Sequence, residues 1–152
     1  MPTPYDKLEW LVIEKLVTLL SNEFPTSKIY KADLPKLHHY TDEGTFCIET
    51  VSADPTIEGV PHSRIAEICT FTIFIYLRYV DKEKGQEDII DLKNHLEAFL
   101  DNNTNVQNDI WYDSNCGRTE FGIAVLGEGK TQTYLRMAAM SWSCKIYRQR
   151  QV

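Results

Sequence analysis

One long stretch of the chain, residues 64–80, contains neither glycine nor proline and is rich in isoleucine, phenylalanine, threonine and tyrosine. This composition is typical of a β-strand. Because successive side chains of a strand point to opposite faces, the odd-numbered positions share one face. That face is mostly apolar and carries Ile65, Cys69, Phe71, Ile73, Ile75 and Leu77. We therefore expect it to pack against the core.

The opposite face of the same stretch is mixed in polarity, with Phe74 among polar and charged residues. The more apolar face has the stronger claim to the core, so the mixed face should lie away from the helices. Its polarity fits partial exposure to water or contact with another subunit. We therefore predict an oligomer or partner interface on this face, at Arg64, Thr70, Thr72, Tyr76 and Arg78.

Two other stretches have the periodicity of helices. Apolar residues recur at helical spacing from about Pro4 to Glu23, and Pro25 stops that helix. Trp10 widens its apolar face, which predicts burial on more than one side, in the core or against a partner. A second helix is expected from Glu87 to about Asn102, after a turn at Asp81–Gly85.

The remaining regular segments have the alternation or composition of strands. They are expected at Ser27–Ala32, Thr45–Ser52, Ile110–Tyr112, Thr119–Leu126 and Gln132–Tyr147. Long loops at Asp33–Gly44 and Asp54–Ser63 separate some of them, and long loops in compact domains usually carry interactions. The element order is then α-β-β-β-α-β-β-β. This order predicts an α+β fold, with one mostly antiparallel sheet and two helices packed on one face.

Composition narrows the classes of protein. With 152 residues, 43% of them hydrophobic, the chain suits a single domain with its own core. A net charge of −6 opposes binding to phosphate backbones, so we expect no nucleic-acid partner. Glu67 and Arg78 interrupt the most apolar window, which predicts no transmembrane helix and no membrane partner. The polar N-terminus does not resemble a secretory signal, which predicts an intracellular protein.

The four cysteines are scattered and form no CxxC pair. They are Cys47, Cys69, Cys116 and Cys144. An intracellular protein would keep them as free thiols, whereas a secreted one with the same even number would have room for two disulfides. We predict free thiols.

Residues 124–131, AVLGEGKT, resemble a relaxed phosphate-binding loop with alanine in place of the first glycine. Such a loop needs a following helix whose N-terminus faces the anion, but the residues after Lys130 have the pattern of a strand. A hairpin loop through Gly127, Glu128 and Gly129 is the simpler interpretation.

Side chains able to catalyse reactions or bind metals do not occur at useful spacings. His38 and His39 are adjacent, so in an extended segment they point in opposite directions and cannot bind one metal together. His62 and His95 stand alone, and Cys116 has no base at a recognisable spacing. We predict no catalytic residue, no cofactor and no metal site, and hence no enzyme.

The charge distribution is uneven along the chain. No acidic residue follows Glu128, whereas five basic ones do, and we interpret the chain from about residue 145 as a basic C-terminal tail. Neutralisation by neighbouring carboxylates is one explanation. The other is head-to-tail association, in which the basic end of one copy meets an acidic surface on the next, weakly and in a salt-dependent way. This second explanation adds Lys145, Arg148 and Arg150 to the predicted interface.

Three stretches resemble the tail terminator (tail completion) proteins of long-tailed bacteriophages. Residues 64–100, RIAEICTFTIFIYLRYVDKEKGQEDIIDLKNHLEAFL, are similar to the central strand, charged turn and second helix of that family. The amphipathic N-terminal helix before a loop-rich segment also resembles it. So does the last strand, YLRMAAMSWSCKIY, which runs into a basic tail.

The resemblance implies a small α+β subunit that forms a ring, commonly a hexamer, at the head-proximal end of the tail tube. Such a ring ends tube polymerisation and presents a surface to the head-completion protein. The expected partners are further copies of the chain, the tail tube protein and the head-completion protein. The expected location is the tail of the virion, assembled in the host cytoplasm. The alternatives are another phage neck, connector or minor capsid protein, or a small α+β ligand-binding or regulatory module.

Overall fold

The computed structural model describes residues 8–31, 41–58, 64–106, 110–126 and 133–149. For residues 56–58, 64, 65, 82, 126, 148 and 149 the description covers the backbone only. Within these ranges, neither helix is long and apolar enough to cross a membrane.

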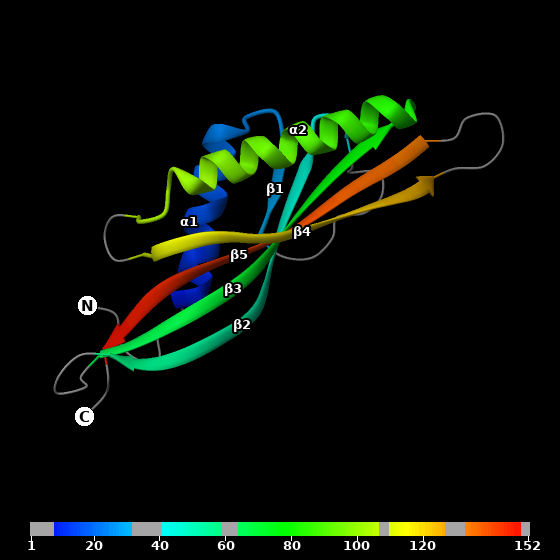
Figure 1. Ribbon diagram of the computed structural model, residues 1–152. Coiled ribbons are helices and arrows are strands. Elements are labelled where there is room, and N and C mark those ends of the chain that lie inside the picture. The colour runs from blue at the N-terminus through cyan, green and yellow to red at the C-terminus, as the bar shows by residue number, and fades with distance from the viewer. Residues whose placement is uncertain (1–7, 32–40, 59–63, 107–109, 127–132, 150–152) are drawn as a thin grey trace.

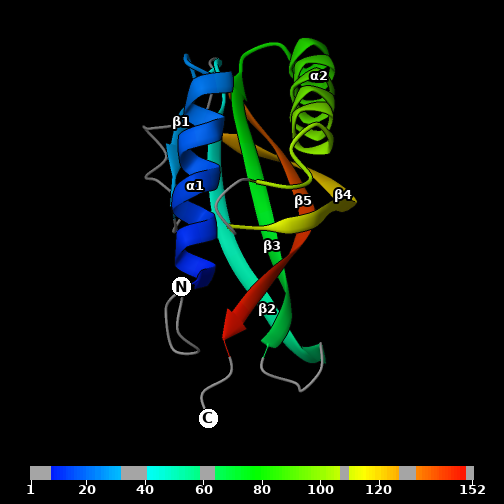
Figure 2. The same ribbon diagram turned by 90° about the vertical axis from the view of Figure 1, so that its left-hand side faces the viewer.

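The fold is α+β, as the sequence predicts, with a five-stranded sheet and two helices (Figure 1). The elements in chain order are α1 (Leu8–Glu23), β1 (Lys28–Tyr30), β2 (Thr45–Glu58), β3 (Arg64–Tyr79), α2 (Lys82–Asp101), β4 (Tyr112–Leu126) and β5 (Thr133–Gln149). The strand order across the sheet is β1-β2-β3-β5-β4. Only β1 and β2 pair in parallel, and all the other pairs are antiparallel. The strands twist strongly along their length (Figure 2).

The core lies between the two helices and one face of the sheet. One cluster of buried side chains joins α1, α2, β2, β3 and β5, so both helices cover the same face. Its aromatic centre is Trp142, whose ring lies 5.7 Å from that of Phe71 and 5.1 Å from that of Trp111. The β3 residues in this cluster are Cys69, Phe71, Ile73, Ile75 and Leu77, which confirms the predicted core face. Ile65 belongs to the residues described by backbone alone.

The other face of the sheet has a small apolar cluster of its own. Cys47, Tyr76 and Leu135 are buried there, and Tyr30, Phe74 and Met137 pack around them. Tyr76 is only 5% exposed, which is less than the mixed polarity of this face suggested. The reason is that its neighbours on β2 and β5 are also apolar.

The strand β2 is longer than predicted, because it continues to Glu58 where the sequence indicated a loop from Asp54. Pairing with β3 explains the difference: the ladder continues to the partners Glu58 and Arg64, with one irregularity after Thr50. Pro55 lacks a backbone N–H, but a strand with an unpaired outer edge tolerates this loss.

One strand, β4, replaces the two that were expected at Ile110–Tyr112 and Thr119–Leu126. The polar residues between them suggested a break. Instead, two shifts in register, characteristic of β-bulges, carry the strand through this region. Asp113 has a positive φ of 49°, which gives the backbone the local bend.

The helix α2 begins at Lys82, earlier than predicted, and Asp81 is its N-cap. The Asp81 side chain accepts hydrogen bonds from the backbone N–H groups of Glu83 and Lys84. Gly85, which suggested a turn, lies inside the first turns of the helix. A Cβ there would lie 3.1 Å from the side chain of Tyr79, a tight contact, so glycine favours the close approach of helix and strand.

At the other end of the chain, β5 extends to Gln149 and pairs there with the beginning of β3. Residues 145–149 therefore belong to the sheet, where the sequence suggested a basic tail.

The N-cap gives a direct test of the earlier helix start. We expect Asp81→Ala to lower the free energy of unfolding by about 1 kcal/mol, because two backbone N–H groups lose their acceptor. Asp91→Ala, an exposed position within the same helix, is the matched control. Urea unfolding measures both. Equal stability of the two variants would contradict the capping role.

Candidate functional site

Five of the eight residues predicted as interface have described side chains, and all five lie on the sheet face away from the helices. Thr70, Thr72, Tyr76 and Arg78 follow one another along β3, and Lys145 lies on β5 opposite Ile68. Thr70, Thr72, Arg78 and Lys145 are partly exposed. The side chains of Arg64 and Arg148, and the whole of Arg150, lie outside the described residues.

We call this face the open face. Small neutral hydroxyls occupy its middle, where Thr70 is paired with Ser143 and Thr72 with Ser141. These neutral hydroxyl groups do not by themselves call for an acidic surface on a neighbouring copy.

The two outer edges of the sheet provide a second candidate surface. At one edge β4 pairs only with β5. Three large apolar side chains of β4 are exposed there, Phe121 at 52%, Ile123 at 44% and Val125 at 57%. They are paired with Ala138, Arg136 and Tyr134, which places them on the helix-bearing side of the sheet. We call these three residues the β4 ridge.

At the opposite edge, β1 covers only the first three residues of β2, and among the residues that the structure describes β2 has no outer partner beyond Cys47. Exposed apolar side chains occur here as well: Trp10 at 41% and Val51 at 61%. A hollow of about 270 Å³ lies between α1 and this edge, and Trp10, Ile13, Ile48 and Thr50 help to line it. We call it the α1 hollow.

Sequence reasoning found only part of these edge surfaces. The wide apolar face of the first helix predicted burial of Trp10 in the core or against a partner; Trp10 is 41% exposed, and the ammonium of Lys31 lies 5.8 Å from the centre of its ring. The β4 ridge was missed, because alternating apolar residues in a strand normally indicate a core face.

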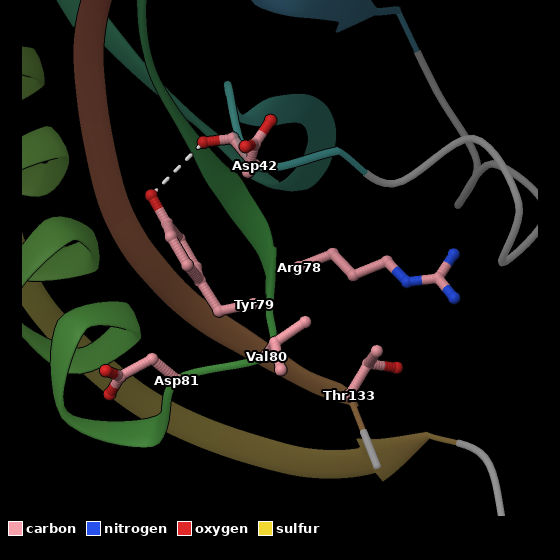
Figure 3. Close-up of a pocket in the computed structure, with 6 residues that line it drawn as sticks. All are labelled: Asp42, Arg78, Tyr79, Val80, Asp81 and Thr133. Atoms are coloured by element: carbon pink, nitrogen blue, oxygen red, sulfur yellow. Dashed lines mark hydrogen bonds between the residues drawn. The ribbon is translucent and has the colours of Figure 1, made fainter. Parts of the chain in front are cut away.

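A larger hollow, of about 430 Å³, lies at the end of β3 between Asp42, Arg78, Tyr79, Val80, Asp81 and Thr133 (Figure 3). Arg78 and Tyr79 project in opposite directions from the strand. The Tyr79 hydroxyl donates a 2.6 Å hydrogen bond to the Asp88 carboxylate and lies 3.2 Å from the backbone oxygen of Asp42. Burial raises the pKa of Tyr79 above its ordinary value, and the hydrogen bond to Asp88 and the nearby carboxylates raise it further. Tyr79 thus links β3 to α2 as a neutral phenol.

All four cysteines are free thiols, as predicted. Burial raises the pKa of Cys47 to about 12, with a further contribution from Glu49. Burial also raises the pKa of Cys116 to about 12, and the carboxylates of Asp101 and Glu97 add to the shift. Because the thiolate is the nucleophile, Cys116 is poorly suited to covalent catalysis.

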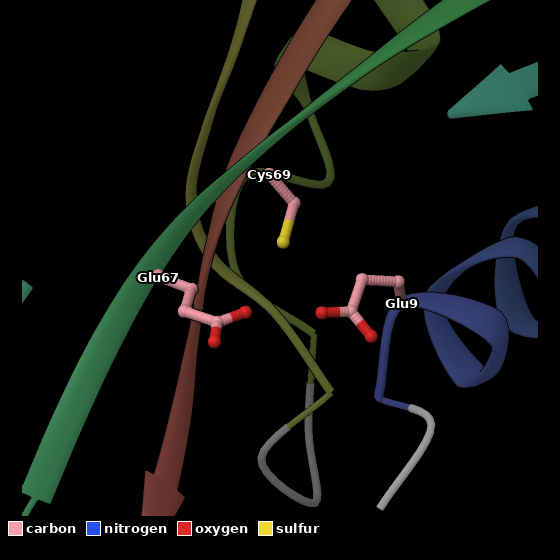
Figure 4. Close-up of side chains that lie close together, drawn as sticks. All are labelled: Glu9, Glu67 and Cys69. Carbon is pink, nitrogen blue, oxygen red and sulfur yellow. The ribbon is translucent and has the colours of Figure 1, made fainter. Parts of the chain in front are cut away.

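The side chains of Glu9, Glu67 and Cys69 come together beneath the beginning of α1 (Figure 4). Their ligand atoms all lie within 4.8 Å of one another. Among the residues that the structure describes, this is the one group of three or more His, Cys, Asp or Glu side chains close enough to hold an ion. Sequence spacing could not reveal it, because Glu9 is far from the other two along the chain.

The histidines and the glycine-rich segment considered in the sequence analysis do not form a recognisable site among the described residues. His38, His39 and His62 lie outside the described residues, and His95 forms a 2.8 Å contact with the Glu23 carboxylate. The glycine-rich segment 127–132 also lies outside them. It joins the antiparallel partners β4 and β5, so a strand follows it where a phosphate-binding loop needs a helix.

Comparison with known proteins gives no assignment: no protein-family model matches the chain, and no curated protein is significantly similar to it.

The buried thiols predict a dependence of stability on pH. Their pKa values are higher in the folded chain than in the unfolded one, so their contribution to stability is complete at neutral pH and is lost as the pH rises above about 9. Urea unfolding at a series of pH values measures this loss. Cys47→Ala should reduce the fall between pH 8 and pH 10 (roughly the range of thiol ionisation). A free energy of unfolding that stays constant or rises across this range would contradict the assignment.

Proposed function

We propose that this protein is a structural subunit of a ring, of the kind that tail terminator proteins form at the head-proximal end of a phage tail tube. The ring would end tube polymerisation and present a surface to the head-completion protein. The proposal combines the resemblance of residues 64–100, the helix before them and the last strand with the surfaces of the fold.

The observation that carries the proposal is that, in the part of the chain that the structure describes, the sheet has two largely unpaired edges, each with exposed apolar side chains. The β4 ridge lies at one edge, and the α1 hollow with Trp10 and Val51 lies at the other. Unpaired strand edges and apolar patches are both sites where another chain can add. A subunit in which two different edges can each bind another chain is suited to head-to-tail association.

The strand directions fit this mode of association. Within one subunit, β4 runs antiparallel to β5, β5 to β3 and β3 to β2, so β4 is also antiparallel to β2. The β4 edge of one copy placed beside the β2 edge of the next would therefore continue an antiparallel sheet. Repetition of such a heterologous contact gives a ring when the rotation closes. All helices would then lie on one side of the ring wall and all open faces on the other.

The edges also carry features that restrain association of free subunits. Two bulges interrupt β4 near Arg118, which is charged and 83% exposed in its side chain, and Pro55 lies in β2. Charges, bulges and prolines are common means of limiting edge-to-edge pairing. Association in solution would then be weak, and it would strengthen where the tube end presents several subunits together. Lys145, Arg148 and Arg150 would add a salt-dependent part.

The test is tube length. Purified wild-type protein, added to polymerising tail tube protein from the same genome, should yield shorter tubes by electron microscopy. A variant with Phe121→Ser and Val125→Ser should leave the tubes long, because it loses two side chains of the β4 ridge. Val80→Ser, which changes an apolar side chain that is 74% exposed but lies outside the ridge, is the matched control.

Tubes of unchanged length with the wild-type protein would contradict the terminator function. Shortening by the double variant that equals the wild-type effect would contradict the role of the β4 ridge.

A further inference from the structure

The cluster of Glu9, Glu67 and Cys69 has the donor atoms of a metal site, and of its three members Glu9 also lines the α1 hollow. Glu67 and Cys69 are two residues apart on β3, so their side chains leave the same face of the strand. Glu9 comes from the first turn of α1. Figure 4 shows the two carboxylates and the Cys69 sulfur directed into one space between helix and strand.

Burial distinguishes this cluster from a surface group of acids. Cys69 is 1% exposed, and both glutamates are partly buried. Two charged carboxylates at such a partly buried site repel each other, and a cation bound between them would remove the repulsion. The core side chains around Cys69 hold one wall of the site in place, whereas the glutamates at its rim can adjust.

The distances are compatible with coordination. Around a tetrahedral zinc ion the ligand atoms are about 3.5 Å apart, given bond lengths of about 2.0 to 2.3 Å. The three atoms here lie within 4.8 Å of one another, so small rotations of the glutamate side chains would complete the geometry.

A second thiol lies next to the cluster. Cys144 on β5 is the direct cross-strand partner of Cys69, on the same face of the sheet, and is also 1% exposed. The surroundings of the cluster are therefore rich in sulfur.

We propose that Glu9, Glu67 and Cys69 form a binding site for a thiophilic divalent cation, with Zn²⁺ as the best match. A thiolate selects Zn²⁺ over Mg²⁺ and Ca²⁺, which prefer all-oxygen sites. On binding, the Cys69 thiol transfers its proton to solvent and a zinc–sulfur bond forms. The bound ion would fasten the first turn of α1 to β3, and it would stabilise the folded chain by mass action.

Co²⁺ is the probe for this proposal, because its bonds to thiolate give a charge-transfer absorption in the near ultraviolet. The chelator-treated full-length protein should bind one Co²⁺ per chain with that absorption, and Zn²⁺ should displace it. Zn²⁺ should also raise the melting temperature, whereas Mg²⁺ at the same concentration should not.

Three variants make the assignment specific. Cys69→Ser should abolish the thiolate absorption, and Cys116→Ser, the matched control on β4, should keep it. Glu9→Gln keeps the size of a partly exposed side chain and removes its charge, and it should weaken Zn²⁺ binding at least tenfold. Absence of the absorption in the wild-type protein, or its persistence in Cys69→Ser, would overturn the proposal. These measurements need no ring, so they succeed or fail independently of the assembly function.

Discussion

The ladder of backbone hydrogen bonds that joins β3 to both of its neighbours supports every other part of this structure. The strand pairs with β2 from Arg64 to Tyr76 and with β5 along its whole length. Its odd-numbered side chains face the helices and its even-numbered ones form the open face. Both helices pack on the first of these faces through the cluster that contains Phe71 and Trp142. The free edges of the sheet follow from the same strand order, because within the described residues β4 is outermost on one side and β2 has only the three residues of β1 beyond it on the other.

The elements that the sequence predicted well are those with a local signature. The alternation along residues 64–80 predicted the core strand, and helical spacing predicted the two helices, the first of which ends before Pro25. Together these elements predicted the fold class. The errors occurred where a distant partner decides the outcome. Pro55 and the polar residues after Tyr112 look like breaks, yet pairing with β3 and β5 keeps both segments in strands. The cluster of possible metal ligands forms only because Glu9 lies beside β3, and the packing of α1 brings it there.

The surfaces of the fold point to a different contact between copies from the one that the charge distribution suggested. The proposed function stays the same. Charge segregation along the chain suggested a contact through basic C-terminal residues. In the structure, β5 incorporates that segment into the sheet up to Gln149, and Lys145 lies on the open face. The β4 ridge and the pair Trp10 and Val51 lie instead at the two edges, although Ile68 on the open face is exposed as well. Burial of large apolar side chains contributes more to association than exposed ion pairs do, so the edges are the better candidates for the main contact.

Cross-linking between different edges tests the head-to-tail account most directly. In a Cys116→Ser background, one variant carries a cysteine on β4, at Thr119 or Ile123, and another carries one on β2, at Thr50 or Asp54. The two are mixed at high concentration with a short bismaleimide and analysed by mass spectrometry. The account predicts cross-links between the β4 variant and the β2 variant, and few within either variant alone. Efficient cross-linking of the β4 variant to itself, or no cross-linking in any mixture, would contradict it.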